Sequence, residues 1–336
     1  MGHFPVSNSN LSASHLGLFL QEKYRLSPDT HCRILRAGVN HTYLAEDGAD
    51  KFVFRVYSLN WRMEKEILEE IRLLTLLKKK DIPVSYPIAD KAGNYIQVLN
   101  APEGDRPGVL FSYAKGEKLH SYPPEIHHRI GVVLGRMHSV TRGLPLDRVV
   151  YTPQILLTEP LEQIRKFLST DTPEWAFLES ARDYITDQLT NADTAQLRRG
   201  VVHLDIWFDN LNISKDGQPT LFDFDFAGNG WLCLDLAYYI LQVHNLEREE
   251  GERKLKMDHF LQGYESIVKI TDEERRLLPM LGVCLYIFYL GTQCRRFDNW
   301  SNSFLSESYL KRYINVLIKK YYDLYQPGGY LNRSNK

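Results

Sequence analysis

The residues best suited to chemistry lie in two short segments near the middle of the chain. The first is Val201-Val-His-Leu-Asp-Ile-Trp-Phe-Asp-Asn210, where Asp205 follows a histidine by two residues and Asn210 follows Asp205 by five. The second is Leu221-Phe-Asp-Phe-Asp225, with Asp223 thirteen residues beyond Asn210. Phosphoryl transfer from ATP needs a carboxylate that orients the acceptor hydroxyl and oxygen ligands for the metal on the phosphates. The spacing therefore predicts Asp205 as the catalytic base and Asn210 and Asp223 as ligands of Mg²⁺.

A simpler alternative is a loop acid and a loop amide between two buried strands, because Asp and Asn are common in turns. Both segments, however, follow apolar runs, Gly200-Val-Val and Pro219-Thr-Leu-Phe. Between them, Ser214-Lys-Asp-Gly-Gln218 predicts a hairpin turn, since Asp-Gly favours the positive φ of tight hairpins. A catalytic loop, a hairpin and a metal loop follow one another in the order that a kinase needs, which favours the functional interpretation.

With these motifs the chain resembles the aminoglycoside phosphotransferase and choline kinase family, the small-molecule branch of the protein-kinase-like fold. The run from Asp223 to Trp231, followed by Asp235-Leu-Ala, is similar to homoserine-kinase-like and stress-response-kinase-like bacterial members. The resemblance implies an α+β, two-lobed fold. It places a small antiparallel-sheet N-terminal lobe in residues 1–114 and a mostly helical C-terminal lobe in 115–325. The Pro-Gly-Gly run at the start of residues 326–336 predicts a flexible tail.

Composition agrees with a soluble, cytoplasmic enzyme. The chain has 336 residues, 43% of them hydrophobic, and a formal net charge of -1, which favours neither a nucleic-acid partner nor a membrane surface. Its four cysteines form no C-x-x-C pair, which argues against a zinc or redox motif. The longest apolar stretch, residues 278–290, is too short to span a bilayer and predicts a buried core helix.

The elements of the first lobe must position the nucleotide. Alternation predicts strands over 32–36, 42–46 and 51–57, followed by a helix over 62–80. By resemblance, the turn between the first two strands covers the nucleotide phosphates; it contains Gly38, where glycine allows close backbone approach, and Asn40.

The third strand carries Arg55 where the family usually has a lysine that pairs with the phosphates. Arginine is permanently charged and forks onto phosphate oxygens, so it can serve the same role. A carboxylate on the following helix should anchor this cation. Glu70 fits best, with Glu66 one turn earlier as the alternative; should Arg55 be a surface residue, Arg36 and Lys51 are the next candidates for the cation.

Two more strands, over 96–100 and 108–116, lead to the family's hinge, which places Ser112 to Ala114 at the adenine, chiefly through main-chain groups. The remainder is predicted to be helical, over about 12–24 before the sheet and 125–140, 159–169, 173–190, 235–247, 252–268, 273–295 and 303–325 after it.

Three further residues belong to the catalytic and metal loops. In this fold the histidine two before the base, His203 here, usually braces the loop, and Leu204 replaces a glycine found in most members. Asp235 is either the N-cap of the next helix or, by resemblance, a support for the catalytic loop. Asp225 either joins the metal shell or faces the acceptor.

The acceptor is left open among several classes. Aromatic residues cluster near the motifs and could stack on a sugar, cover a cation or pack the core: Trp207, Phe208, Trp231, Tyr238 and Tyr239. The leading hypothesis is an ATP- and Mg²⁺-dependent kinase for a small-molecule hydroxyl, in an amino alcohol, a sugar, a hydroxy amino acid or an aminoglycoside-like antibiotic. A protein serine or threonine acceptor is second, and a nucleotide-binding pseudokinase third.

Overall fold

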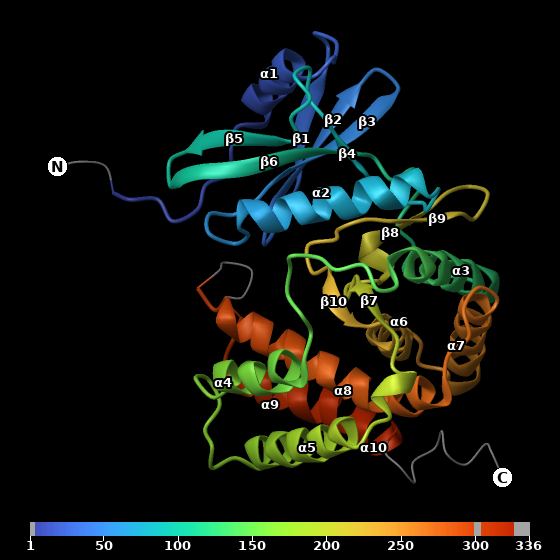
Figure 1. Cartoon of the computed structure of the whole chain (residues 1–336). Helices are drawn as coiled ribbons and strands as arrows, with labels where there is room; N and C mark the ends of the chain where they lie inside the picture. Colours follow the sequence, from blue (N-terminus) through green and yellow to red (C-terminus); the bar gives the residue numbers. More distant parts are fainter. Residues whose placement is uncertain (1–3, 299–303, 326–336) are drawn as a thin grey trace. The chain divides into compact units, whose positions relative to one another are not determined.

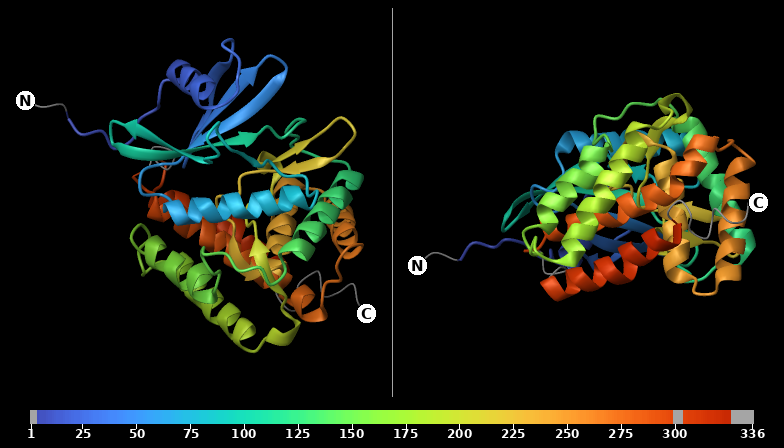
Figure 2. Two further views of the ribbon diagram at one scale, coloured as in Figure 1. Left: turned by 45° about the horizontal axis from the view of Figure 1, so that its top comes forward. Right: turned by 90° about the horizontal axis from the view of Figure 1, so that it is seen from below.

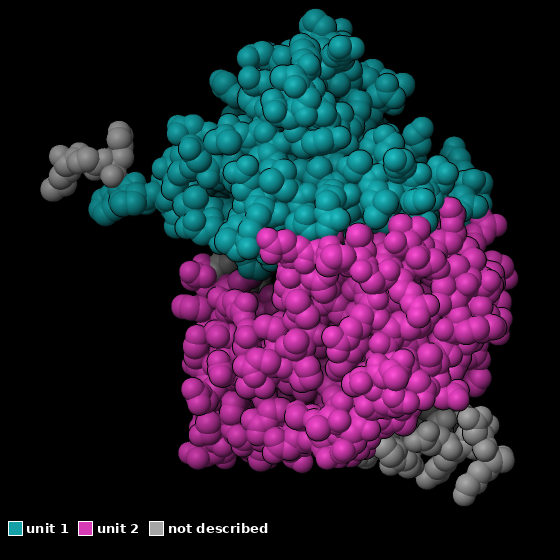
Figure 3. Space-filling model, in the orientation of Figure 1, with its two compact units in different colours: residues 1–119, 209–225 teal, residues 120–208, 226–336 magenta. Residues whose placement is uncertain are grey.

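A computed structural model describes residues 4–298 and 304–325, and its chain divides into two compact units (Figure 3). Unit 1 comprises residues 1–119 and 209–225, and unit 2 comprises residues 120–208 and 226–336. This division differs from a single break after residue 114, because the segment from Asp209 to Asp225 makes its contacts with the first part of the chain. The predicted flexible tail, 326–336, lies outside the described residues.

Unit 1 is built on a six-stranded antiparallel sheet (Figure 1). Its strands are β1 (His31–Ala37), β2 (His41–Asp47), β3 (Asp50–Val56), β4 (Pro87–Ile88), β5 (Ile96–Ala101) and β6 (Gly104–Ser112). The spatial order is β1-β2-β3-β6-β4, and β5 pairs with β6. Helix α1 (Ala13–Lys23) packs on the sheet, where Leu16 and Leu20 meet Tyr43 and Phe54 in one apolar core.

Helix α2 (Glu64–Lys79) carries the predicted apolar stripe, and Ile67, Ile71, Leu74 and Leu77 are all buried. Its first turn is capped by Glu66, whose carboxylate accepts the Met63 backbone N–H at 2.9 Å. Glu70 lies on the buried side of the same helix with only 1% of its surface exposed. A buried carboxylate on an otherwise apolar face requires a partner, which the site described below supplies.

The second segment of unit 1 is a hairpin formed by β8 (Leu211–Ile213) and β9 (Pro219–Leu221). Its turn is the one predicted from Asp-Gly: Gly217 has φ 79°, and Ser214 Oγ accepts the Gln218 N–H. The hairpin joins unit 1 through backbone bridges from Leu221 to Val84 and from Ile213 to Glu117. Gly116 permits the second bridge, since a Cβ there would lie 2.3 Å from the Ile213 carbonyl oxygen.

Unit 2 is mostly helical, as expected, but it also contains a two-stranded antiparallel ladder whose pairing was not predicted. The ladder pairs β7 (Arg199–Val202) with β10 (Gly228–Trp231). The helices are α3 (Pro124–Thr141), α4 (Glu159–Ile164), α5 (Pro173–Thr190), α6 (Cys233–Leu246), α7 (Glu250–Glu265), α8 (Asp272–Arg295), α9 (Glu307–Tyr313) and α10 (Lys320–Tyr325). Wider π-helical turns at Gln154–Thr158 and Ile314–Lys319 precede α4 and join α9 to α10.

Helices α3 and α7 lie side by side (Figure 2), and glycines set their close approach. A Cβ on Gly131 of α3 would lie 2.1 Å from the Phe260 carbonyl oxygen of α7. A Cβ on Gly263 of α7 would lie 2.0 Å from the His128 carbonyl oxygen of α3. Neither distance is possible for a real side chain, so both positions require glycine for packing.

The predicted apolar stretch 278–290 forms part of α8, which has 24 residues. The helix as a whole, unlike the stretch alone, is long and apolar enough to cross a membrane. Its apolar window is nevertheless 72% buried within the structure. Helix α8 begins with a capping box between Thr271 and Glu274. The burial of the apolar window explains α8 as a core helix, as predicted for the stretch 278–290.

Candidate active site

The catalytic loop follows β7, and the first turn of α6 holds it in place. Asp235 is fully buried, and its carboxylate accepts the N–H groups of His203 at 2.8 Å and Leu204 at 2.7 Å. His138 Nε2 lies 3.0 Å from the same carboxylate. Because α6 begins at Cys233, Asp235 is not the N-cap, and the loop-supporting role implied by the resemblance is the one the geometry favours.

His203 braces the same loop from within. Its Nδ1 lies 3.2 Å from the Asp205 backbone nitrogen, so this ring nitrogen accepts a hydrogen bond from the residue it precedes by two. The side chain is fully buried. A histidine engaged in this way orients the loop and is a poor candidate for proton transfer.

Leu204 adopts the left-handed backbone conformation, with φ 61°. For a residue with a Cβ this conformation costs about 1–2 kcal/mol, which explains why a glycine is usual here. The surroundings hold the strained residue on both sides, because its N–H donates to Asp235 and its carbonyl accepts the Tyr289 hydroxyl. Backbone strain of this kind persists where neighbouring groups over-determine it, as they often do at active sites.

Asp205 itself is half-buried and accepts a hydrogen bond from Tyr238. The distance from Tyr238 Oη to Asp205 Oδ1 is 2.7 Å. Burial, and then the Asp205 charge, raise the pKa of Tyr238 well above its ordinary value, so the phenol keeps its proton and remains a donor. Tyr238 thus stabilises Asp205 in its charged form and fixes one of its two oxygens.

A second group of functional side chains lies in unit 1, around Arg55. Its guanidinium donates from one nitrogen to Glu70 Oε1 and from the other to Asp223 Oδ1, both at 2.9 Å. Burial acts to lower the pKa of Arg55, but Asp223 and Glu70 raise it well above its ordinary value. Glu70 also accepts the Tyr57 hydroxyl at 3.1 Å. The predicted contact between Arg55 and Glu70 is present, and Arg55 reaches a predicted metal ligand as well.

The alternative residues considered for the roles of Glu70 and Arg55 form other ion pairs. Glu66 caps its own helix and lies 3.6 Å from Arg62. Lys51 pairs with Glu46 at 3.0 Å, at the exposed end of β2 and β3 beside the turn that joins them. Arg36 forms an ion pair with Asp209 at 2.8 Å. Arg55 therefore remains the best-placed cation for the phosphates in unit 1.

Asn210 and Asp223 lie close together because the backbone pairs beside them. The Phe222 N–H donates to the Asn210 carbonyl at 3.2 Å, where the hairpin begins and ends. Asp223 has φ 64°, and its side chain is 39% exposed despite its ion pair with Arg55. The left-handed conformation turns this carboxylate out of the strand that precedes it.

The donor set of these two residues fits Mg²⁺. A carboxylate and an amide supply hard oxygen ligands, and magnesium in kinases takes its other ligands from water and substrate phosphates. Across residues 4–298 and 304–325, no group of three or more His, Cys, Asp or Glu side chains could hold a metal without such help. A site completed by the nucleotide agrees with both observations.

The turn between β1 and β2 is held by its own side chains. The Gly38 N–H donates to the Asn40 carbonyl at 3.2 Å, and Asn40 Oδ1 accepts the Ser58 N–H at 3.2 Å. Ser58 Oγ also donates to the Val39 carbonyl. The Asn40 side chain thus shapes the turn, and contact of Gly38 and Asn40 with phosphates stays a prediction.

The two residues predicted to contact adenine, Ser112 and Ala114, differ in how many of their main-chain groups already form hydrogen bonds within the protein. The Ser112 N–H donates to the Tyr86 carbonyl at 2.8 Å, and its carbonyl accepts the Ser85 hydroxyl. Ser112 is therefore committed to the sheet, and its N–H is not available for adenine. The Ala114 carbonyl accepts Asn212 Nδ2, which ties the hinge to β8. Contact between Ala114 and adenine stays a prediction.

Several functional contacts were missed from the sequence. Asp225 accepts Trp61 Nε1 at 2.8 Å and Arg62 Nε at 3.2 Å, and Arg62 also donates to its carbonyl at 2.7 Å. This donor pair holds Asp225 on the segment before α2, so a metal ligand or an acceptor-facing group is the less favoured role. Trp61 and Arg62, at the start of the predicted helix, are both hydrogen-bond donors. Nothing in the sequence links them to an acid more than 160 residues away.

Asp209, beside Asn210, was also missed. Arg36 lies 2.8 Å from one of its oxygens and Lys118 lies 2.6 Å from the other. Burial acts to raise the pKa of Asp209, but Lys118 and Arg36 hold it below its ordinary value. Within unit 1, these ion pairs tie the segment before β8 to the strand before the β1–β2 turn, through Arg36, and to the segment after β6, through Lys118.

Comparison with known proteins agrees with this geometry. Residues 31–272 match the model of the phosphotransferase enzyme family. An uncharacterised protein of Synechocystis is 30% identical over 94% of this chain and 87% of its own length. The homoserine kinase of Methylobacillus glycogenes is 26% identical over 76% of this chain and 77% of its own. A solved amicoumacin kinase superposes with a TM-score of 0.71 at 20% identity, covering 90% of this chain and 93% of that one.

The fold and the two groups of side chains define a kinase-like protein with a sheet-based N-terminal part and a helical remainder, which confirms the predicted fold class. The chain belongs to the phosphotransferase enzyme family, and it is an enzyme of the kinase class.

Proposed function

We propose that this protein transfers the γ-phosphoryl group of ATP to a hydroxyl group of a small molecule, with Mg²⁺ on the phosphates. The observation that carries the proposal is the array in unit 1, where Arg55 bridges the buried Glu70 and the partly exposed Asp223. Such an array suits a polyanion that binds together with a divalent cation, because Arg55 can pair with phosphate oxygens and Asp223 with the metal. The amicoumacin kinase, solved with AMP-PNP and Ca²⁺, supports the same donor and a divalent metal.

Each residue of the array has a separate role. Glu70 holds one nitrogen of Arg55 in place, so the guanidinium keeps its orientation without a ligand. The other nitrogen can exchange the Asp223 carboxylate for a phosphate oxygen, because a planar fork binds either group. Asp223 and Asn210 would then hold Mg²⁺, which supplies neutralisation of the charge on the phosphates.

Asp205 is proposed to orient the acceptor hydroxyl and to take its proton. The hydrogen bond from Tyr238 keeps the carboxylate charged and directs its second oxygen. Asp235 and His203 keep the loop in this conformation, so they act through the position of Asp205 and not on the substrate. Since ATP is the donor, the cytoplasm is the expected location.

The acceptor class that we favour is a small alcohol with an amino group. In unit 2, an aromatic cluster surrounds the tyrosine bonded to Asp205: Tyr289 lies 5.5 Å from Tyr238 and 5.7 Å from Phe226, centroid to centroid. Aromatic faces attract ammonium groups, and the Asp205 carboxylate adds negative charge. The homoserine kinase relative, named for a hydroxy amino acid, supports this class.

A coupled assay of ADP release with a panel of acceptors tests the proposal. The panel holds homoserine, ethanolamine, a sugar without an amino group and an aminoglycoside, with a serine-containing peptide as the competing class. We expect turnover with at least one amino-bearing alcohol and none with the peptide, and the turnover of the alcohol should require Mg²⁺. Turnover with the peptide alone would favour the protein kinase, and binding of ATP without turnover of any acceptor would favour the pseudokinase.

A further inference from the structure

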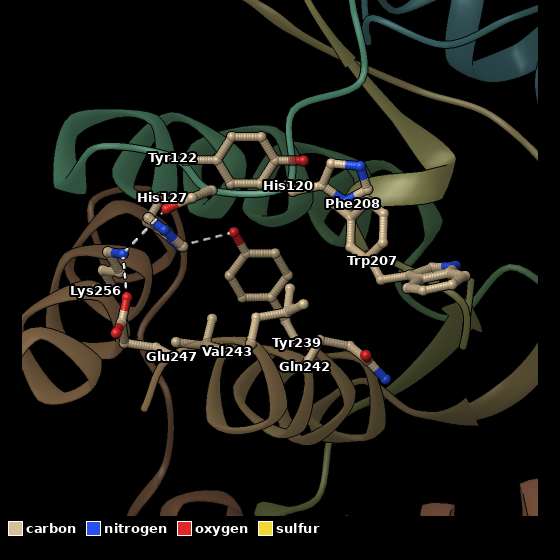
Figure 4. Close-up of a pocket in the computed structure, with 12 residues that line it drawn as sticks. His120, Tyr122, His127, Trp207, Phe208, Tyr239, Gln242, Val243, Glu247 and Lys256 are labelled. Carbon is tan, nitrogen blue, oxygen red and sulfur yellow. Dashed lines mark hydrogen bonds and ion pairs between the residues drawn. The ribbon is translucent and has the colours of Figure 1, made fainter. Parts of the chain in front are cut away.

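Unit 2 contains a pocket on the side of α6 that faces α3 and α7 (Figure 4). Its cavity has a volume of about 50 Å³. The lining comes from the segment before α3 (His120, Ser121, Tyr122), from α3 (His127), from the catalytic loop (Trp207, Phe208), from α6 (Tyr239, Gln242, Val243, Leu246), from its end (Glu247) and from α7 (Lys256). Figure 4 shows Tyr239 rising from α6 toward His127, with Phe208 and Trp207 at the other end of the pocket.

The pocket is separate from the proposed acceptor site at Asp205. Tyr238 and Tyr239 are neighbours on α6, and they point to different helices. Tyr238 bonds to Asp205 and packs on Tyr289 of α8. Tyr239 bonds to His127 of α3 at 2.9 Å and stacks on Phe260 of α7 at 4.0 Å. Asp205 does not line the pocket, so a molecule bound there is not presented to the catalytic base.

Polar atoms in the pocket lack partners. Within the described residues, Tyr122 Oη, His127 Nε2 and Trp207 Nε1 are buried and make no hydrogen bond. Tyr122 and His127 are themselves more than nine-tenths buried, with 6% and 5% of their surfaces exposed. An unpaired buried polar atom costs about 1–3 kcal/mol, and such atoms in a cavity are normally satisfied by water or a ligand.

The charges that line the pocket cancel. Lys256 Nζ lies 2.5 Å from Glu247 Oε2 and 3.4 Å from Ser121 Oγ. Burial, and then the charge of Lys256, lower the pKa of His127 to about 4, so the imidazole is neutral at pH 7. An anion or a cation entering the pocket would have no unpaired opposite charge to meet, and a buried unpaired charge is costly.

We propose that this pocket is a binding site for a small neutral polyol, held against the catalytic loop. Hydroxyl groups both donate and accept, so they can satisfy a phenol, a neutral imidazole and an indole N–H together. The rings of Tyr122, Phe208 and Tyr239 provide the apolar walls usual for small-molecule sites. The volume holds roughly three to five water-sized groups, so it encloses most of a three-carbon polyol, which has six non-hydrogen atoms. Through Trp207 and Phe208, its binding would restrain the loop that carries Asp205.

Glycerol is the probe for the first test, in full-length protein with ¹⁵N-labelled tryptophan indoles. The Trp207 resonance is assigned by its loss in Trp207→Phe. We expect millimolar glycerol to shift this resonance saturably and to leave the Trp61, Trp175 and Trp231 resonances in place. Matched probes test the chemistry: 1-propanol lacks two of the hydroxyls and glycerate carries a charge, so each should bind at least about tenfold more weakly.

Tyr122→Phe is the decisive variant, because it removes only the unpaired hydroxyl. It should keep the fold and weaken glycerol binding by about five- to tenfold, the loss of one hydrogen bond. Tyr24→Phe is the matched control, since Tyr24 also has a buried hydroxyl without a partner in the described structure but lies in unit 1. It should leave glycerol binding unchanged.

The proposal is overturned if the Trp207 resonance shows no saturable shift, which would mean that the cavity holds water only. It is also overturned if Tyr122→Phe and Tyr24→Phe bind glycerol equally, or if glycerate binds as tightly as glycerol. None of these measurements needs ATP or an acceptor, so their outcome is independent of the proposed kinase reaction.

Discussion

At the scale of single residues, the catalytic loop depends on a leucine in a conformation that suits glycine. Leu204 has φ 61° and is fully buried. Leu204→Ala and Leu204→Gly both remove the buried side chain, but only glycine removes the backbone strain. We expect Leu204→Gly to be more stable than Leu204→Ala by about 1 kcal/mol, the reverse of the usual order at a structured position. Urea unfolding of the two variants measures the difference, and a more stable alanine variant would contradict it.

The proposed binding of the ATP phosphates depends on Arg55. Arg55→Lys keeps the charge but cannot contact Glu70 and a phosphate with one planar fork. We expect the KM for ATP to rise by about tenfold or more, which corresponds to one lost charge-assisted hydrogen bond. Glu70→Ala should have a similar effect, and a double-mutant cycle with Arg55→Lys should be strongly non-additive.

Lys51→Ala is the control for Arg55, because Lys51 is the other cation of β3 and forms its ion pair, with Glu46, at the exposed end of the strand. It should leave the KM for ATP unchanged. If Lys51→Ala raises the KM and Arg55→Lys does not, the phosphate-binding cation has been misassigned.

At the scale of elements, the packing of α3 on α7 depends on the absence of side chains at two glycines. Gly131→Ala would place a methyl group 2.1 Å from a carbonyl oxygen of α7. We expect it to destabilise the protein by about 1–3 kcal/mol, as overpacking does. Gly251→Ala, in the first turn of α7, meets nothing within 4 Å and should be neutral or stabilising by about 0.5–1 kcal/mol. Equal effects in thermal unfolding would show that the two helices can move apart at little cost.

The helices and the motif spacing were largely predictable from the sequence, because periodicity and turn chemistry are local. The apolar stripe of α2 and the Asp-Gly turn before β9 are examples, and the spacing of His203, Asp205 and Asn210 was enough to propose their roles. Contacts between distant segments were not predictable. Nothing local connects Asp225 to Trp61 and Arg62. The support of the loop by Asp235 was expected only from the family resemblance, because no local pattern shows that its carboxylate accepts two loop N–H groups.

At the scale of the whole molecule, the chain divides differently from the predicted lobes. The hairpin between Asp209 and Asp225 joins unit 1 because its strands bridge to Val84 and Glu117. The proposed metal ligands therefore belong to the unit that contains Arg55, and Asp205 belongs to the unit that contains α6. The proposed roles separate in the same way. Nucleotide and metal binding belong to unit 1, and the orientation and deprotonation of the acceptor hydroxyl belong to unit 2.

This separation makes Asp205→Asn the most direct test of the central claim. The substitution keeps the size of the side chain and the nucleotide-binding groups of unit 1, but it removes the carboxylate that orients the hydroxyl and takes its proton. With an acceptor that the parent protein turns over, kcat should fall by roughly 10²–10⁴-fold. The dissociation constant for Mg-ATP, measured by calorimetry on the same sample, should stay within about threefold of the parent value. Near-normal turnover, or a loss of ATP binding that matches the loss of turnover, would contradict the assignment of Asp205 as the catalytic base.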